Sequence, residues 1–213
     1  MSDNLVMLPI KLFALLYAIV IHEWAHGYAA YKMGDNTAYY MGRLTLNPLK
    51  HIDPIGTVIL PAVMLLTGSP VLFGWAKPVP INPHNFDDIK KSTMYVSLAG
   101  PAANLVSAFA FAGLFHLIIP YMNEFSFATP ILYFLIFGAI INIVLFAFNL
   151  IPIPPLDGSH VVSMFLSPKQ AYQYNKIAPY GFFIIMGMVI IGITDIYLRL
   201  IMHLFVILVR LPL

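Results

Sequence analysis

The stretch Ala18-Ile-Val-Ile-His-Glu-Trp-Ala-His-Gly27 places two histidines and a carboxylate in otherwise apolar surroundings. His22 and His26 stand four residues apart, so on an α-helix they lie on one face, one turn from each other. In that position the two imidazole rings can reach a single ion. The pattern His-Glu-x-x-His is typical of two zinc ligands and a glutamate, here Glu23, that acts on the metal-bound water.

The neighbouring residues predict that this helix crosses a membrane. Apolar residues run almost without interruption from Leu5 to Val20, and up to Tyr31 the segment exceeds the about 20 residues that a spanning helix needs. Ionisable groups at that depth are costly unless a cation or a partner compensates them. A chance match on a solvated helix is the alternative. The apolar surroundings favour metal binding, provided that a third ligand exists.

The composition is that of a polytopic membrane protein. Of the 213 residues, 60% are hydrophobic and 9% are charged, and the mean hydropathy is +0.84. Soluble domains carry about a quarter charged residues. The net charge of +2 is too small, and the basic residues are too scattered, to indicate nucleic-acid binding. Because the chain contains no cysteine, its zinc ligands must be His, Asp, Glu or water.

The hydrophobic pattern predicts an all-α membrane protein with a single domain over residues 1–213. We place its core at residues 5–166 and two additional C-terminal transmembrane helices at residues 175–211, the two joined by a turn at Thr194 and Asp195. The candidate spans are Leu5–Tyr31, Thr93–Ile119, Pro130–Leu150, Ile177–Ile193 and Ile196–Val209.

A further apolar segment, Ile52–Thr67, is short and contains prolines, so its length suits a re-entrant or interfacial element as well as a span. The distribution of charges favours the re-entrant or interfacial element. If it does not cross, the Lys and Arg residues of the long loops fall on one side and the opposite loops carry none, as the positive-inside rule requires. The N-terminus is then outside and the polar loops are cytoplasmic.

Two segments of this polar region complete a short β/loop region. Thr37–Leu46 is rich in aromatic and β-branched residues and predicts a strand or hairpin. Phe73–Pro83 carries too many prolines for a helix and predicts an extended, poorly paired segment. An exposed edge at Thr37–Leu46 or Val79–Asn82 would hold an unwound substrate by strand addition.

Asp157 is the candidate for the third ligand. Among the acidic residues, only Glu23 and Asp157 lie in apolar surroundings; the others fall in polar loops or turns. Asp157 also suits a helix cap or a turn before Gly158. The predicted topology brings it to the same side as His22 and His26, which favours the ligand.

Three motifs in order, His22-Glu-Trp-Ala-His26, Ala99-Gly-Pro-Ala-Ala-Asn104 and Asn149-Leu-Ile-Pro-Ile-Pro-Pro-Leu-Asp-Gly158, resemble the site-2 protease family of intramembrane zinc metalloproteases. The resemblance implies a three-helix catalytic core, Zn²⁺ held by His22, His26 and Asp157, Glu23 as the catalytic residue and Asn149 facing the substrate. The chain resembles the compact branch, because residues 119–130 leave no room for a PDZ domain and we expect no C-terminal regulatory domain.

The two asparagines have open alternatives. Asn104 lies among small residues, which favours close helix packing, with a substrate-binding or supporting role as the alternative. The amide of Asn149 suits an extended peptide or a developing oxyanion, and the alternative is that it caps its own helix.

These observations predict a zinc-dependent endopeptidase that hydrolyses peptide bonds in or near transmembrane segments of membrane-protein substrates. We expect it in the plasma membrane of a prokaryote, embedded in the lipid bilayer with its active site toward the cytoplasm. A polytopic metal-ion transporter and a non-catalytic membrane adaptor are the alternatives.

Overall fold

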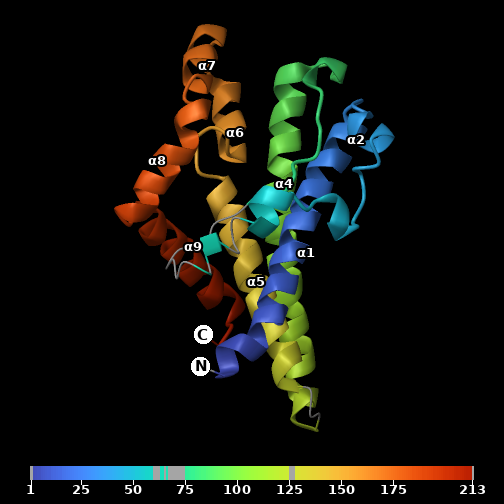
Figure 1. Ribbon diagram of the computed structural model, residues 1–213, viewed down its shortest axis with the longest axis vertical. Helices are drawn as coiled ribbons and strands as arrows, with labels where there is room; N and C mark the ends of the chain where they lie inside the picture. The colour runs from blue at the N-terminus through green and yellow to red at the C-terminus, as the bar shows by residue number, and fades with distance from the viewer. Residues whose placement is uncertain (1, 60–62, 65, 67–74, 125–127, 213) are drawn as a thin grey trace.

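The computed structural model describes residues 2–59, 63–64, 66, 75–124 and 128–212, and within these ranges it contains helices and no β-strand. Three long helices pack along the length of the molecule: α1 (Ser2–Lys32), α4 (Ile89–Ile118) and α5 (Ala128–Asn149) (Figure 1). Each is long and apolar enough to cross a membrane. The three long spans predicted from the sequence are therefore present.

Local sequence signals set the ends of these helices. The side chain of Asp88 caps α4 by accepting a hydrogen bond from the Lys91 backbone N–H at 3.0 Å. α5 ends at Asn149, just before the prolines that begin at Pro152 and cannot continue a helix. The 3₁₀ helix η4 (Ile119–Glu124) follows α4 and leads toward α5.

Small residues allow α1 to lie close to its neighbours. Ala14 and Ala18 are fully buried, and short side chains let the helix backbones approach. Farther from the His-Glu-x-x-His motif, Phe111 and Phe115 of α4 and Ile143 of α5 form a buried apolar cluster. Tyr17 of α1 contacts the ring of Phe111 edge to face, with ring centroids 5.3 Å apart, so the motif-bearing helix also packs on this cluster.

The C-terminal part contains α6 (Asp157–Phe165), α7 (Pro168–Asn175), α8 (Ala178–Ile190) and α9 (Ile193–Val209). Ser167 and Gln170 form a capping box that starts α7. α6 packs against α4, and α9 packs against α5.

The prediction of two separate C-terminal spans was wrong. α8 has 13 residues and α9 has 17, and the two helices form a pair bent by 74°, which amounts to one span at most. They do not double back: the C-terminus lies at the same end as the N-terminus (Figure 1). The break falls at Gly192, whose φ of 81° favours glycine, rather than at Thr194. The Asp195 carboxylate is free to pair with Arg199 at 2.9 Å.

The described residues between α1 and α4 contain no strand and include the short helices α2 (Thr37–Tyr40), η1 (Pro48–Lys50), the π-helix η2 (Pro54–Ile59) and η3 (Pro83–Asn85).

The predicted strand or hairpin at Thr37–Leu46 was wrong. The Asp35 carboxylate accepts hydrogen bonds from the backbone N–H and the hydroxyl of Thr37, which starts a helical turn. Gly42, with φ of 63°, then redirects the chain.

The predictions for Phe73–Pro83 and for Ile52–Thr67 have different outcomes. Residues 75–82 have no regular secondary structure, as predicted. Pro83 instead begins η3, and Phe73 and Gly74 lie outside the described residues. Much of the second half of Ile52–Thr67 also lies outside them, so its re-entrant path stays a prediction.

Candidate metal centre

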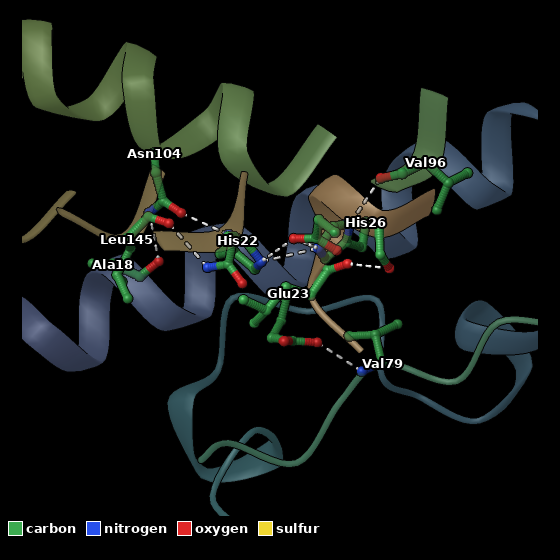
Figure 2. A network of polar contacts seen from close by, with 12 residues as sticks. Ala18, His22, Glu23, His26, Val79, Val96, Asn104 and Leu145 are labelled. Atoms are coloured by element: carbon green, nitrogen blue, oxygen red, sulfur yellow. Dashed lines mark hydrogen bonds and ion pairs between the residues drawn. The ribbon is translucent and has the colours of Figure 1, made fainter. Parts of the chain in front are cut away.

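The ligand atoms of His22, His26 and Asp157 lie within 4.8 Å of one another. Figure 2 shows the side chains of the two histidines next to each other. The two Nε2 atoms lie 2.9 Å apart, and Asp157 Oδ2 lies 3.2 Å from that of His22 and 3.4 Å from that of His26. The histidines project from α1, and Asp157 is the first residue of α6. Each histidine is only 8% exposed. Residues more than 130 positions apart in the sequence thus form one buried cluster.

The hydrogen bonds made by the two Nδ1 atoms determine which nitrogen of each histidine carries the proton. His22 Nδ1 lies 2.6 Å from Asn104 Oδ1, and His26 Nδ1 lies 2.7 Å from the Val96 carbonyl oxygen. Both oxygens can only accept, so each Nδ1 donates its proton and each Nε2 presents a lone pair to the cluster.

A second asparagine fixes the orientation of the Asn104 amide. Asn104 Nδ2 donates to the Ala18 carbonyl at 2.9 Å and to Asn142 Oδ1 at 2.8 Å, and Asn142 Nδ2 donates to the Gly138 carbonyl at 2.8 Å. The amide oxygen of Asn104 must therefore face His22. This network joins α1, α4 and α5 directly behind the first histidine.

The cluster fits a zinc ion. Two imidazole lone pairs face Asp157 Oδ2, a buried carboxylate oxygen that finds no hydrogen-bond donor among the described residues. Acceptors facing one another repel unless a cation lies among them. Two imidazole nitrogens and one carboxylate oxygen are ligands that Zn²⁺ uses in catalytic sites, where a fourth position is left open.

Two glycines make room for this arrangement. A Cβ on Gly100 would press into the rings of His26 and His22, so only glycine lets α4 pass this close to the histidines. A Cβ on Gly158 would collide with the carbonyls of Leu150 and Ile151, where the chain folds back next to Asp157. The glycines of the second and third motifs therefore have a steric role.

The C-terminal helices support the loop that carries Asp157. Tyr174 on α7 donates its hydroxyl to the Pro152 carbonyl at 2.8 Å. Gly181 on α8 packs so closely on the Pro154 carbonyl that a side chain there would not fit. Neither contact has a signal in the sequence, because each joins two segments through a backbone oxygen.

Glu23 points to a different partner. Its Oε2 accepts a hydrogen bond from the Val79 backbone N–H at 2.8 Å, and Figure 2 shows the side chain reaching toward the loop that carries Val79. The carboxylate is not among the ligand atoms that gather at the centre. Glu23 is therefore a neighbour of the cluster rather than a fourth ligand.

The two candidate substrate residues lie in different environments. Asn104 has no exposed surface and its amide bonds to His22, Ala18 and Asn142, so its position favours a supporting role. Asn149 is half-buried and donates to the Leu145 carbonyl of its own helix at 3.0 Å. A contact between either residue and substrate stays a prediction.

The bundle and its buried site are those of a membrane-embedded metal-binding protein, and the comparison with known proteins gives the class, zinc metallopeptidases. The model of "Peptidase family M50" matches residues 112–191. A Bacillus subtilis (strain 168) protein named "Putative zinc metalloprotease YwhC" is 39% identical over 180 residues, which are 84% of this chain and 78% of that protein. "Putative zinc metalloprotease Rip2" of Mycolicibacterium smegmatis is 34% identical over 176 residues, 82% of this chain and 64% of the relative.

The Rip2 protein of Mycobacterium tuberculosis (strain H37Rv) is 29% identical over 154 residues, 72% of this chain and 56% of that protein. No solved structure matches. The chain belongs to peptidase family M50, the site-2 protease family that its motifs resemble, and it is a zinc metalloprotease.

Proposed function

We propose that His22, His26 and Asp157 hold the zinc ion of this protease and that Glu23 is its general base. The observation that supports this assignment is the convergence of two histidine lone pairs and an orphan carboxylate oxygen on one buried point. The point lies within a bundle of apolar, membrane-length helices.

A zinc ion held by these residues would act as a Lewis acid and would lower the pKa of a bound water to about 7. Glu23 accepts the proton of the attacking water and returns it to the nitrogen of the leaving amine. Asn104 and the Val96 carbonyl keep both imidazoles in the tautomer that binds metal. The buried surroundings strengthen each of these electrostatic contacts.

We propose that the substrate is a membrane protein cleaved in or near a transmembrane helix. A helical substrate must unwind locally, because its carbonyls are bonded within the helix. The expected strand addition at Val79–Asn82 has little support: prolines 78 and 80 have no N–H, and the N–H groups of Val79 and Asn82 are bonded to Glu23 and Asp35. We place substrate binding elsewhere around the metal centre.

We further propose that the site opens toward the cytoplasm of a prokaryotic cell. The two chain termini, the end of α4 and the start of α5 lie at one end of the molecule, and α2, α6 and the start of α4 lie toward the other (Figure 1). The lysines at the α4 end favour a cytoplasmic position for it.

Cysteine labelling tests this orientation, because the chain has no cysteine of its own. We expect Tyr121→Cys and Pro212→Cys, both at exposed positions, to react with an impermeant thiol reagent applied to intact cells. His84→Cys, also exposed, should react only after the membrane is permeabilised. Labelling of the His84→Cys protein in intact cells would contradict the proposed orientation.

Metal removal tests the function itself. We expect the purified protein to cleave a transmembrane substrate in liposomes, to lose cleavage after chelation and to regain it with stoichiometric Zn²⁺. The same liposomes, loaded with a zinc-sensitive dye, report metal flux. Flux without cleavage would indicate a transporter, and substrate binding without cleavage or flux would indicate an adaptor.

A further inference from the structure

Glu23 has a hydrogen-bond partner outside the metal centre, the backbone N–H of Val79. This N–H donates to Glu23 Oε2 at 2.8 Å, across 56 positions of sequence (Figure 2). Hydrogen bonds to a carboxylate are stronger and more directional than those between neutral groups. The long side chain of Glu23 is therefore held by one defined donor.

The sequence around Val79 leaves little choice of donor. In Pro78-Val79-Pro80 both neighbours are prolines without an N–H, so Val79 carries the only backbone donor of the three residues. The prolines also restrict the backbone to extended conformations. This segment presents one N–H in a prearranged direction.

A buried arginine holds the segment on one side. Arg43, which is 7% exposed, donates from Nη2 to the carbonyls of Lys77 at 2.9 Å and Pro78 at 3.2 Å. The Lys77 N–H in turn donates to the His51 carbonyl at 2.9 Å. The two residues that precede Val79 are thus tied to the loop after α2.

A buried carboxylate holds the segment on the other side. The Asn82 N–H donates to Asp35 Oδ2 at 2.7 Å, and Asp35 has no exposed surface. Burial by itself raises the pKa of Asp35, but hydrogen bonds from Thr37, Asn82 and Asn85 outweigh it and hold that pKa below its ordinary value. Asp35 is therefore an ionised, strong acceptor at neutral pH.

Packing completes the attachment of Val79 to α1. Its side chain is buried, and a Cβ on Gly27, one turn after Glu23, would press on Val79 Cγ1 and Leu44. Gly27 therefore allows the segment to lie directly on the helix that carries the catalytic glutamate. With anchors on both sides and a packed side chain, the segment is a fixed part of the structure rather than a displaceable plug.

We propose that the Val79 backbone N–H is a positioning group that holds Glu23 beside the metal centre and prevents its carboxylate from becoming a fourth ligand. This role rests on the proposed function of Glu23. A carboxylate next to an open zinc position is itself a good ligand, and it would occupy the place that the reacting water needs. Bonding of one oxygen to Val79 leaves the other to accept the proton.

Val79→Pro tests the proposal, because it removes the N–H in a segment that already tolerates proline. We expect kcat to fall about 10²-fold with KM little changed, since a small misplacement of a catalytic group has this effect. Val79→Ala keeps the N–H but loses most of the side-chain packing, so it separates the two contributions, and its kcat should fall far less than that of Val79→Pro. An equal loss in both variants would assign the effect to side-chain packing and overturn the proposal.

Zinc release to a chelator provides a readout that does not depend on cleavage. If Glu23 swings onto the metal in Val79→Pro, release should slow by about 10-fold, the order of effect that nearby ligand changes produce. The double variant Val79→Pro with Glu23→Gln should release zinc as fast as Glu23→Gln alone. Equal release rates for Val79→Pro and wild type would overturn the proposal.

An ester bond in place of the Pro78–Val79 amide deletes the N–H while keeping the valine side chain, so it gives the same test if Val79→Pro does not fold. Wild-type kcat and wild-type zinc release in the ester protein would overturn the proposal. If the wild-type protein binds zinc but cleaves no membrane substrate, the proposed function fails separately, and the release rates still decide the role of Val79.

Discussion

Replacing Glu23 by Gln is expected to lower the cleavage rate by about 10²- to 10⁴-fold, the range that general acid–base catalysis contributes. The amide has nearly the shape of the carboxylate but cannot accept the proton of the attacking water. Zinc content should remain at one ion per chain, because Glu23 lies outside the cluster of ligand atoms. Cleavage of a transmembrane substrate and metal analysis on the same purified protein measure both quantities.

A matched control for Glu23→Gln removes one carboxylate that does not belong to the cluster of ligand atoms. Asp195 lies at the start of α9 and is paired with Arg199 near the surface, so Asp195→Asn changes the net charge equally. We expect its cleavage rate and zinc content to stay near wild type. Wild-type turnover in the Glu23→Gln protein would remove Glu23 from the catalytic role.

Asp157→Asn should lose the zinc ion together with the activity. An amide oxygen is a much weaker zinc ligand than a carboxylate, and two histidines alone fall short of the three protein ligands of catalytic sites. We expect zinc affinity to fall by more than the about 10- to 100-fold that loss of an outer-shell contact costs. Equilibrium dialysis against a zinc buffer measures this affinity.

The alternative role of Asp157, stabilising the start of α6, predicts a different result. Loss of a negative charge in the first turn of a helix costs only about 0.3–1 kcal/mol. In that case Asp157→Asn would show a slightly lower melting temperature with and without chelator, and zinc would still bind at one ion per chain. Stoichiometric zinc in this variant would therefore exclude Asp157 as a ligand.

The helices that consist of long apolar segments could be predicted from the sequence. α1, α4 and α5 appear where continuous hydrophobicity placed them, because a membrane-length apolar segment has few alternatives to a helix. The sequence correctly predicted that α8 and α9 are helices, but it did not predict the path that they follow. Whether two short helices form a hairpin or one bent span depends on packing against α5 and on the turn at Gly192.

The prediction of a strand at Thr37–Leu46 was wrong for a related reason. Aromatic and β-branched residues favour a strand only when a partner strand is available. In the structure Asp35 starts a helical turn at Thr37 instead, and the same carboxylate binds the distant Asn82. A local sequence pattern does not show this contact, because the donor, Asn82, lies 47 positions after the acceptor, Asp35.

By itself, the sequence determined the membrane class, the three long helices, the cysteine-free choice of ligands and the candidate set His22, Glu23, His26 and Asp157. These follow from hydrophobicity and from the helical spacing of side chains, which are local properties. Only the tertiary structure decided that Asn104 and Asn142 orient His22, and that Val79 holds Glu23. Those contacts depend on backbone and amide groups that almost every residue type can supply, so their partners emerge only once packing brings distant segments together.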